Sequence, residues 1–426
     1  MILSPALAQP LILAIIGISV ALMLIRPRGI AEVYWISAGV FVLLALQLIP
    51  FRLAWKASGK ALDVCFFLVG MMLLCELARE HGVFDWISAV AVRSANGSCL
   101  RLFTLVYIVG TVVTVFMSND ATTVVLTPAI LTAIRKAKVQ PLPYLFVCAF
   151  IANAASFLLP ISNPANLVVF HDAMPPLAKW LLAFGVPCLL SIATTFVVLL
   201  WIYRDELCER IDHQVDTVRL NTNGKIVLCS AAAMIAVLLT VSSLGNDLGL
   251  PTCILGIVIL SIICIKERSN PFPFAREVSW GTLLLVIGLF IMVDAAEGVG
   301  AMRYTRDWLD WAQNSGNAGP LIAGFGIGIA NNVVNNLPLG LIVGRTLRVA
   351  HASRPITDAV LIGVDLGPNL SITGSLATIL WLIALRKAKV SVSFWQFFKV
   401  GAIAMPLALL AALGGAILMR MLLAAS

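Results

Sequence analysis

Long apolar runs, broken at a few points by polar residues, dominate the chain. One run lies between Arg101 and Arg135 and carries a polar stretch, Ser118-Asn119-Asp120, near its middle. A single helix of about 34 residues would be about 51 Å long, whereas the hydrocarbon core of a bilayer is about 30 Å thick. Basic residues follow both ends, and basic residues favour the cytoplasmic side. We therefore predict a re-entrant hairpin, about 101–136, whose polar tip reaches the middle of the membrane, where surrounding protein or a watery cavity must cover it.

The composition fits the same interpretation. Of 426 residues, 60% are hydrophobic and 12% are charged, and the mean hydropathy is +0.99. Soluble domains carry about 25% charged residues. Several apolar stretches are long enough to span a bilayer, so we predict an all-α polytopic membrane protein. The net charge of +8 is dispersed over loops, where it sets orientation and does not predict binding to nucleic acid.

The order of segments repeats. Each half shows three spans, an amphipathic stretch, a broken hairpin, a broken span and a whole span. Aligning Asn119-Asp120 with Asn335-Asn336 gives an offset of 216 residues, and aligning Asn153 with Asp365 gives 212. Such similar offsets indicate an internal repeat. The predicted parts are a first repeat 1–203 with a broken helix at about 142–172, a cytoplasmic linker 204–225, and a second repeat 226–426 with a hairpin at about 319–350 and a broken helix at about 358–385.

Each repeat has five transmembrane helices plus one re-entrant hairpin, with one of the five helices broken. Because five is odd, the second repeat should be inverted relative to the first. With the N-terminus outside, this topology places most of the 29 basic residues in the cytoplasm, in line with the positive-inside rule. Arg345, Arg348 and Arg354 follow the second hairpin, which would open to the outside, and the pattern offers no physical reason for them.

Interrupted apolar segments at matching positions in two halves are typical of secondary transporters, whose sites lie at the membrane midplane. The ends of half-helices expose unpaired N–H and C=O groups. Two acids, Asp120 and Asp365, also lie at these breaks. A carboxyl group at membrane depth is costly and usually functional, and desolvation favours its neutral form, so we predict that both acids carry protons.

Structural roles compete with these assignments. Asp120 could cap the second half of its hairpin, and Asp365 could be an ion-paired structural acid. The Asn, Ser and Thr residues at the breaks could serve capping and hydrogen bonding between helices. Glu76, Asp63 and Asp294 match no break, so we predict that they pair or lie at interfaces.

Other kinds of chemistry lack a signature. The nine cysteines form no CxxC pattern and no cluster near a break, so the sequence predicts no metal site and no cofactor. It also lacks HExxH, GxSxG or another pairing of nucleophile and base, so an enzyme is not expected.

At the breaks the sequence resembles the arsenite/antimonite efflux permeases of the ion transporter superfamily. The resemblance covers essentially the whole chain. Members of that family tend to carry an acid where this chain has Asn153, which would shift proton coupling towards Asp120 and Asp365. The matching strings are Ser118-Asn-Asp-Ala121 with Leu126-Thr-Pro128, Ser162-Asn163 with Asn166, Asn335-Asn-Leu-Pro338, and Asp365-Leu-Gly-Pro368 with Gly374-Ser-Leu-Ala-Thr378.

This resemblance implies a multi-pass protein of the inner (plasma) membrane that exports arsenite or antimonite, as the neutral trihydroxide, in exchange for protons. It also implies that some members dock a cytoplasmic arsenite-stimulated ATPase subunit. A small neutral polyol-like solute needs hydrogen bonds and no fixed countercharge. The predicted substrate contacts are Ser118, Asn119, Ser162, Asn163, Asn166, Asn335, Asn336, Thr373, Gly374 and Ser375, with Thr122, Thr123, Asn153, Asn332 and Asn369 as secondary candidates.

Alternatives stay open at this point. A sodium/proton antiporter on the same fold would use the same carboxylate and carbonyl oxygens. A carboxylate symporter is less favoured, because two midplane acids would repel its substrate. A channel would differ from a carrier in lacking counterflow and saturation.

Overall fold

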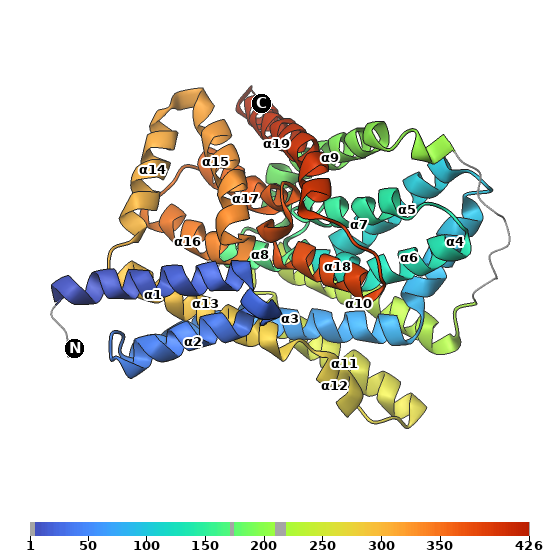
Figure 1. Ribbon diagram of the computed structural model, residues 1–426, viewed down its shortest axis with the longest axis horizontal. Helices are drawn as coiled ribbons and strands as arrows, with labels where there is room; N and C mark the ends of the chain where they lie inside the picture. The colour runs from blue at the N-terminus through green and yellow to red at the C-terminus, as the bar shows by residue number, and fades with distance from the viewer. Residues whose placement is uncertain (1–4, 171–173, 209–218, 426) are drawn as a thin grey trace.

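The computed structural model describes residues 5–170, 174–208 and 219–425, and these residues form helices joined by short loops, with no β-strand among them (Figure 1). The all-α prediction is confirmed. The first half contains α1 (Pro5–Ile25), α2 (Glu32–Ala45), α3 (Phe51–Glu80), α4 (Val83–Ser94), α5 (Cys99–Phe116), α6 (Thr127–Lys136), α7 (Leu142–Ala154), α8 (Pro164–Val169) and α9 (Leu177–Ile202), with short helical turns η1 (Pro27–Gly29), η3 (Pro160–Ser162) and η4 (Glu206–Cys208) and a π-helical segment η2 (Ala121–Leu126).

The second half repeats this order. It contains α10 (Thr222–Ser243), α11 (Gly249–Glu267), α12 (Phe272–Glu277), α13 (Trp280–Gly298), α14 (Met302–Asn314), α15 (Gly319–Val334), α16 (Asn336–Val349), α17 (Arg354–Leu366), α18 (Leu376–Lys387) and α19 (Phe394–Ala425), with turns η5 (Gly316–Ala318), η6 (Gly367–Asn369) and η7 (Ile372–Gly374).

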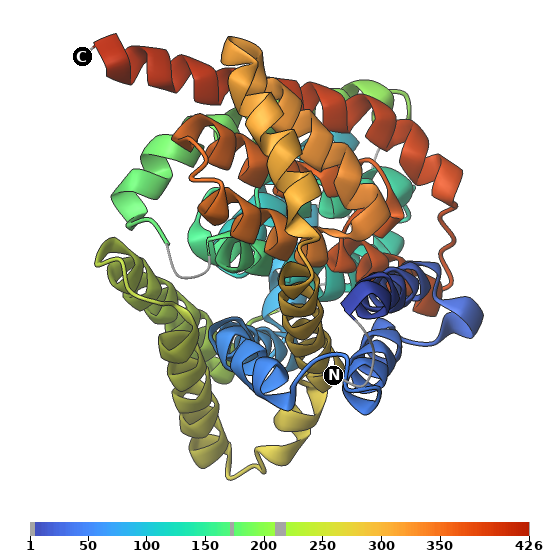
Figure 2. The same ribbon diagram turned by 90° about the vertical axis from the view of Figure 1, so that its left-hand side faces the viewer.

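The helices form two groups. Helices α1, α2, α3, α10, α11 and α13 pack together in the lower part of the view, and both hairpins and both broken spans lie above them with α9 and α19 (Figures 1 and 2). The four interrupted elements of the two halves are therefore gathered in one part of the molecule, and the first group flanks them.

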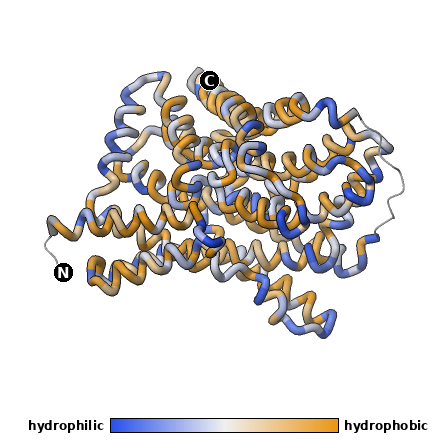
Figure 3. The backbone as a smooth tube through the Cα atoms, in the orientation of Figure 1, coloured by the Kyte–Doolittle hydropathy of each residue, from blue (hydrophilic) through white to orange (hydrophobic). Residues whose placement is uncertain are grey.

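Eight described helices are long and apolar enough to cross a membrane: α1, α3, α5, α9, α10, α11, α13 and α19. Helices α2 and α7 are apolar but shorter. Hydrophobic residues run along most of the helices, and polar residues concentrate in loops and on α14 (Figure 3). These features agree with the predicted multi-pass membrane protein.

The broken spans of the two halves match closely. Every bound of α17, η7 and the start of α18 follows the corresponding bound of α7, η3 and α8 by 212 residues. The same offset separates Asn153 from Asp365, and both residues are the last but one of their helices. The repeat of elements is thus present in the structure, whereas the inverted orientation of the second half stays a prediction.

The breaks of the two hairpins are shorter than the polar stretches that predicted them. Asn335 alone separates α15 from α16, with φ 78° and ψ 149°. Asn331 and Asn332 remain helical, because their amides bond to carbonyls of neighbouring segments; Asn331 Nδ2 donates to Gly363 O at 3.0 Å and to Val364 O at 2.7 Å. In the first hairpin the break falls at Met117 and Ser118, and the helix resumes at Asn119.

The apolar pattern predicts an interruption of the first broken span at 160–166 and a third span from about Ala61 to Leu77. In the structure the interruption begins earlier, after Ala154, and helix α3 begins ten residues earlier, at Phe51. Charged residues hide this part of α3 from a hydropathy pattern, but Lys60 Nζ lies 3.0 Å from Asp294 Oδ2 of α13, so the charge is neutralised within the protein.

The arginines after the second hairpin also have a physical explanation. Arg345 on α16 is 6% exposed and forms ion pairs with Asp294 and Glu297 of α13, the latter at 2.7 Å. Breaking such a buried pair leaves an uncompensated charge, which is strongly destabilising. The predicted pairing role of Asp294 is confirmed. Asp358 in turn pairs with Arg420 at 2.7 Å and lies 3.8 Å from Arg354.

Candidate functional site

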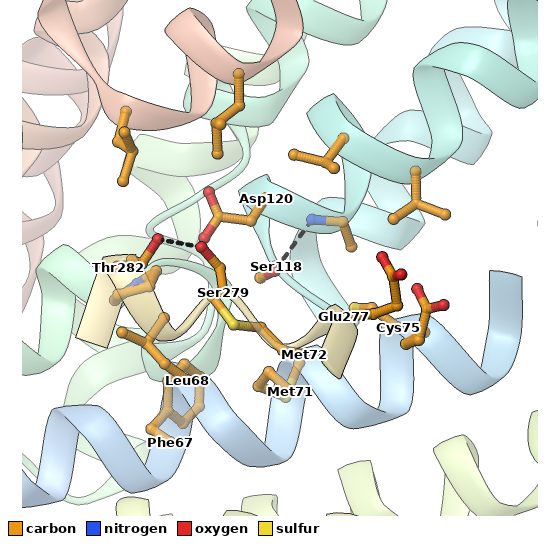
Figure 4. A pocket seen from close by; sticks show the side chains of 17 residues that line it. Phe67, Leu68, Met71, Met72, Cys75, Ser118, Asp120, Glu277, Ser279 and Thr282 are labelled. Carbon is orange, nitrogen blue, oxygen red and sulfur yellow. Dashed lines mark hydrogen bonds between the residues drawn. The ribbon is translucent and has the colours of Figure 1, made fainter. Parts of the chain in front are cut away.

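A cavity of about 240 Å³ lies beside the tip of the first hairpin (Figure 4). Helix α3 forms one wall and the hairpin forms the opposite wall, and the first residues of α8 and α18 contribute Pro164 and Leu376. The break and the π-helical segment of the first hairpin, both broken spans and helices α3, α12 and α13 thus line this space. The lining residues that carry polar or sulfur groups are Met71, Met72, Cys75, Glu76, Ser118, Asp120, Glu277, Ser279 and Thr282.

Asp120 is the acid of the hairpin that faces this cavity (Figure 4). It is half-buried and lies at the start of η2, but its side chain makes no capping hydrogen bond. No described residue forms a hydrogen bond or ion pair with its carboxylate. Ser118, two residues earlier, accepts a hydrogen bond at Oγ from the backbone N–H of Ala121 at 3.2 Å. The structure therefore does not use Asp120 as a cap, and leaves its carboxylate available to a solute.

The facing wall is one side of α3. Met72, Cys75 and Glu76 are three and four residues apart, so they project from the same face of the helix. Glu76 holds Arg79 through two hydrogen bonds, of 2.8 and 2.5 Å, and its predicted pairing is confirmed. The wall therefore combines soft sulfur atoms with one neutralised acid.

A polar vestibule of about 970 Å³ adjoins the cavity, and Glu76 and Glu277 line both spaces. Charged side chains surround the vestibule, among them Arg79, Glu267 and Arg276. In the orientation predicted from the basic residues, these loops are cytoplasmic. The cavity then has a polar route to the cytoplasm, and Glu76 and Glu277 stand where the two spaces meet.

The second acid, Asp365, lies at the centre of a separate network and is fully buried. Its Oδ1 accepts hydrogen bonds from Ser156 Oγ at 2.8 Å and from Asn163 Nδ2. Its Oδ2 is buried without a partner among the described residues. Because Ser156 and Asn163 belong to the first broken span and Asp365 to the second, this acid ties the two repeats together.

Amide side chains extend the same network. Asn153 Nδ2 donates to Asn369 Oδ1 at 2.9 Å, and Asn369 Nδ2 donates to Phe150 O at 3.0 Å. Asn166 Nδ2 donates to Ser156 O at 2.9 Å. Asn163 Oδ1 also accepts from Ala165 N at 3.0 Å and so caps α8.

The tip of the second hairpin is tied to the second broken span. Asn335 Nδ2 donates to Thr373 O at 3.2 Å, and Thr373 Oγ1 donates to Asn332 O at 2.9 Å. Ser371 Oγ donates to Asn332 Oδ1 at 2.7 Å. A space of about 10 Å³ lies beside Asn335, much smaller than the cavity of about 240 Å³ at the first tip.

The remaining predicted contacts are buried within the interrupted segments. Ser162 Oγ donates to Val115 O at 2.8 Å and joins the first broken span to the first hairpin. Gly374 lies so close to Pro368 and Asn332 that a side chain there would overlap them. The others are buried: Asn119 and Asn336, whose Oδ1 atoms lack partners among the described residues, Thr122, bonded to Thr114 at 2.8 Å, Thr123, bonded to Asn119 O at 3.1 Å, and Ser375, which caps α18 at Thr378 N.

Of the predicted site residues, Ser118 and Asp120 line the cavity beside the first hairpin, and most of the others hold the interrupted segments against one another. Residues that the sequence did not single out complete the site: Met72, Cys75, Glu277, Ser279 and Thr282 at the cavity, and Ser156 beside Asp365. The spacing of Met72 and Cys75 is visible in the sequence, but the hydropathy pattern does not indicate which helix faces the hairpin.

The eight cysteines whose side chains are described form no disulfide. The described part of the chain contains no group of three or more His, Cys, Asp or Glu side chains arranged to hold a metal ion.

The apolar helices and the buried polar breaks are those of a multi-pass membrane transporter. Residues 6–363 match the model of the citrate transporter (CitMHS) family, and the chain belongs to this family. It is 26% identical to the arsenical pump membrane protein of Yersinia enterocolitica, over 92% of this chain and 94% of that protein. Identity to an arsenical pump membrane protein of Escherichia coli is 24%, over 91% and 94%.

A further relative, an uncharacterized transporter of Mycobacterium tuberculosis, is 25% identical over 81% of this chain and 83% of its own length. In three dimensions the chain is similar to the YdaH transporter of Alcanivorax borkumensis, with a TM-score of 0.57 at 12% identity over 88% of each chain. That crystal structure is described as having an unusual topology, and the likeness concerns the fold.

Proposed function

We propose that this protein exports trivalent arsenic or antimony, as the neutral trihydroxide, across the inner membrane in exchange for protons. The arsenical pump membrane proteins among its relatives support the substrate. The observation that carries the proposal is Asp120, a carboxylate without a described partner, at a hairpin tip that lines a cavity next to a polar vestibule.

The chemistry of the cavity wall suits a neutral solute. Its described lining residues include Asp120, Glu76 and Glu277 but no lysine or arginine. A tricarboxylate such as citrate needs cationic partners, and acids in a space of low dielectric would repel it. A trihydroxide instead offers hydroxyl donors to carboxylate and hydroxyl oxygens, which Asp120, Ser118 and Thr282 provide.

Exchange of the metalloid for protons follows because the solute and a proton compete for the carboxylate of Asp120. An ionised Asp120 accepts hydrogen bonds from the hydroxyls of the solute, whereas a protonated Asp120 has lost much of that capacity. Protonation from the acidic outside then favours release of the metalloid there, and loss of the proton to the cytoplasm restores the binding form. The ligand shifts the carrier only as far as its affinity differs between the two forms.

Uptake of radiolabelled or mass-detected arsenite into everted vesicles tests the proposal, with and without an imposed proton gradient. We expect saturable uptake that rises with an acidic lumen and does not need sodium. Sodium-driven proton flux without metalloid would instead favour the sodium/proton antiporter, and citrate uptake would favour a carboxylate carrier. Adding a cytoplasmic arsenite-stimulated ATPase subunit with ATP tests the partner that the resemblance implies.

A further inference from the structure

The two acids at the breaks have different surroundings. Asp120 lines the cavity and meets no donor among the described residues. Asp365 is fully buried and lines neither the cavity nor the vestibule. A group that exchanges protons in each cycle needs a path to water, and only Asp120 borders one in this conformation.

The buried hydrogen-bond acceptors around Asp365 outnumber the available donors. Three buried side-chain atoms of its network lack a partner among the described residues: Asp365 Oδ2, Asn153 Oδ1 and Asn166 Oδ1. All three are oxygens, and each amide nitrogen of these two asparagines is already bonded. Buried polar atoms are normally satisfied. A proton on Oδ2 of Asp365 would add the donor that this network lacks.

The charges around Asp365 point the same way. No described lysine, arginine or histidine forms a salt bridge with it, and α7, α8 and α15, which pack against α17, carry no charged residue. The Cys188 thiol on α9 interacts electrostatically with Asp365 and donates to Ala154 O at 3.5 Å. A buried carboxylate without a cation is costly, so the neutral form fits this site.

The charged residues on the other elements packed against α17 do not pair with Asp365. Arg345 of α16 pairs with Asp294 and Glu297 of α13. Arg420 of α19 and Arg354 of α17 lie at Asp358, and Arg306 of α14 lies at Asp310. The remaining charged residues of these helices, which form no salt bridge with Asp365, are Arg303, Asp307, Arg348 and Lys399. Asp120, in contrast, faces Cys75 and Glu76 of α3 and Glu277 of α12 across the cavity.

We propose that Asp365 keeps its proton throughout the transport cycle and acts as a positioning residue, while Asp120 alone exchanges protons. Neutral Asp365 accepts from Ser156 and Asn163 at one oxygen and donates from the other, and so fixes the first broken span against the second. The inference rests on the proposed proton exchange, but it concerns the protonation of a separate residue.

Asp365→Asn provides a sharp test, because an amide has nearly the shape of a protonated carboxyl group and keeps one donor side and one acceptor side. We expect Asp365→Asn to transport arsenite in everted vesicles within about threefold of the wild-type rate and to keep its dependence on the proton gradient. Asp120→Asn should lose that dependence. Asp365→Ala, which leaves Ser156 and Asn163 without their acceptor, should lose transport.

Thermal unfolding in detergent gives a second readout that needs no transport. If Asp365 stays neutral in the folded protein, its proton is released on unfolding at pH 6 to 8, because an exposed aspartate is ionised there. The midpoint of the wild type should therefore fall relative to that of Asp365→Asn as the pH rises from 6 to 8. Midpoints that change in parallel, or an Asp365→Asn variant that folds yet loses the gradient dependence, would overturn the inference. A wild type that ignores the gradient would refute the proposed exchange, whereas a midpoint that still falls relative to that of Asp365→Asn would support a neutral Asp365.

Discussion

Asn153 on α7 donates a 2.9 Å hydrogen bond to Asn369 of η6, and so joins the broken span of the first half to that of the second. The contact is reciprocal at the level of the elements, because Asn369 Nδ2 donates to Phe150 O of α7 at 3.0 Å. Both asparagines are buried. The interrupted segments are therefore held by side-chain bonds that cross between the repeats, in addition to packing.

Replacing both asparagines tests this coupling. Asn153→Ala and Asn369→Ala should each lower stability, and the double variant should lose less than the sum, with a coupling of about 0.5–2 kcal/mol. Denaturant unfolding of the purified protein measures the cycle. The matched control pairs Asn153→Ala with Thr132→Ala, an exposed residue of α6, and should be additive. An additive Asn153/Asn369 pair would show that the bond contributes little.

Cys75 offers a chemical probe of the cavity. It faces Ser118 and Asp120 from α3 (Figure 4), so a bulky adduct on its sulfur should fill the space between them. We expect a small methanethiosulfonate reagent to block arsenite uptake into everted vesicles. Cys75→Ser should keep transport and resist the reagent, whereas Cys229→Ser, which removes an exposed cysteine of α10, should remain sensitive. Inhibition that persists in Cys75→Ser would place the reactive thiol elsewhere.

Arg345 should be important for stability even though it lies outside the cavity. Arg345→Met leaves Asp294 and Glu297 without this partner, and the expected cost is about 3–5 kcal/mol for a broken buried pair. The change should appear as a lower thermal midpoint and a smaller folded yield in detergent. Arg306→Met, on the exposed face of α14, should change stability by less than about 0.5 kcal/mol. Equal midpoints for the two variants would contradict the buried-pair account.

The sequence predicted the helical class, the order of elements and the equivalence of Asn153 and Asp365, because these depend on local hydropathy and on a repeated pattern. It predicted too long a break in the second hairpin, although the observed break at Asn335 lies within the predicted polar stretch. Asparagine has a low helix propensity, yet Asn331 stays helical because carbonyls of α17 accept hydrogen bonds from its amide. That contact is visible only in three dimensions.

The wall of the cavity shows the same limit. Helix α3 is apolar over most of its length, so nothing marked Met72 and Cys75 as neighbours of the first hairpin. The vestibule acid Glu277 lies on a six-residue helix that the pattern did not predict. Ser156 resembles any small polar residue until Asp365, 209 positions later, is placed beside it.

Asp120 is the residue that couples metalloid transport to protons in the proposed mechanism, and metalloid-driven proton movement measures this coupling. In proteoliposomes holding the wild type and a pH-sensitive dye, with no imposed proton gradient, an arsenite gradient should move protons in the opposite direction. Asp120→Asn should still exchange arsenite in counterflow but move no protons. Proton movement by Asp120→Asn at the wild-type rate would contradict the account.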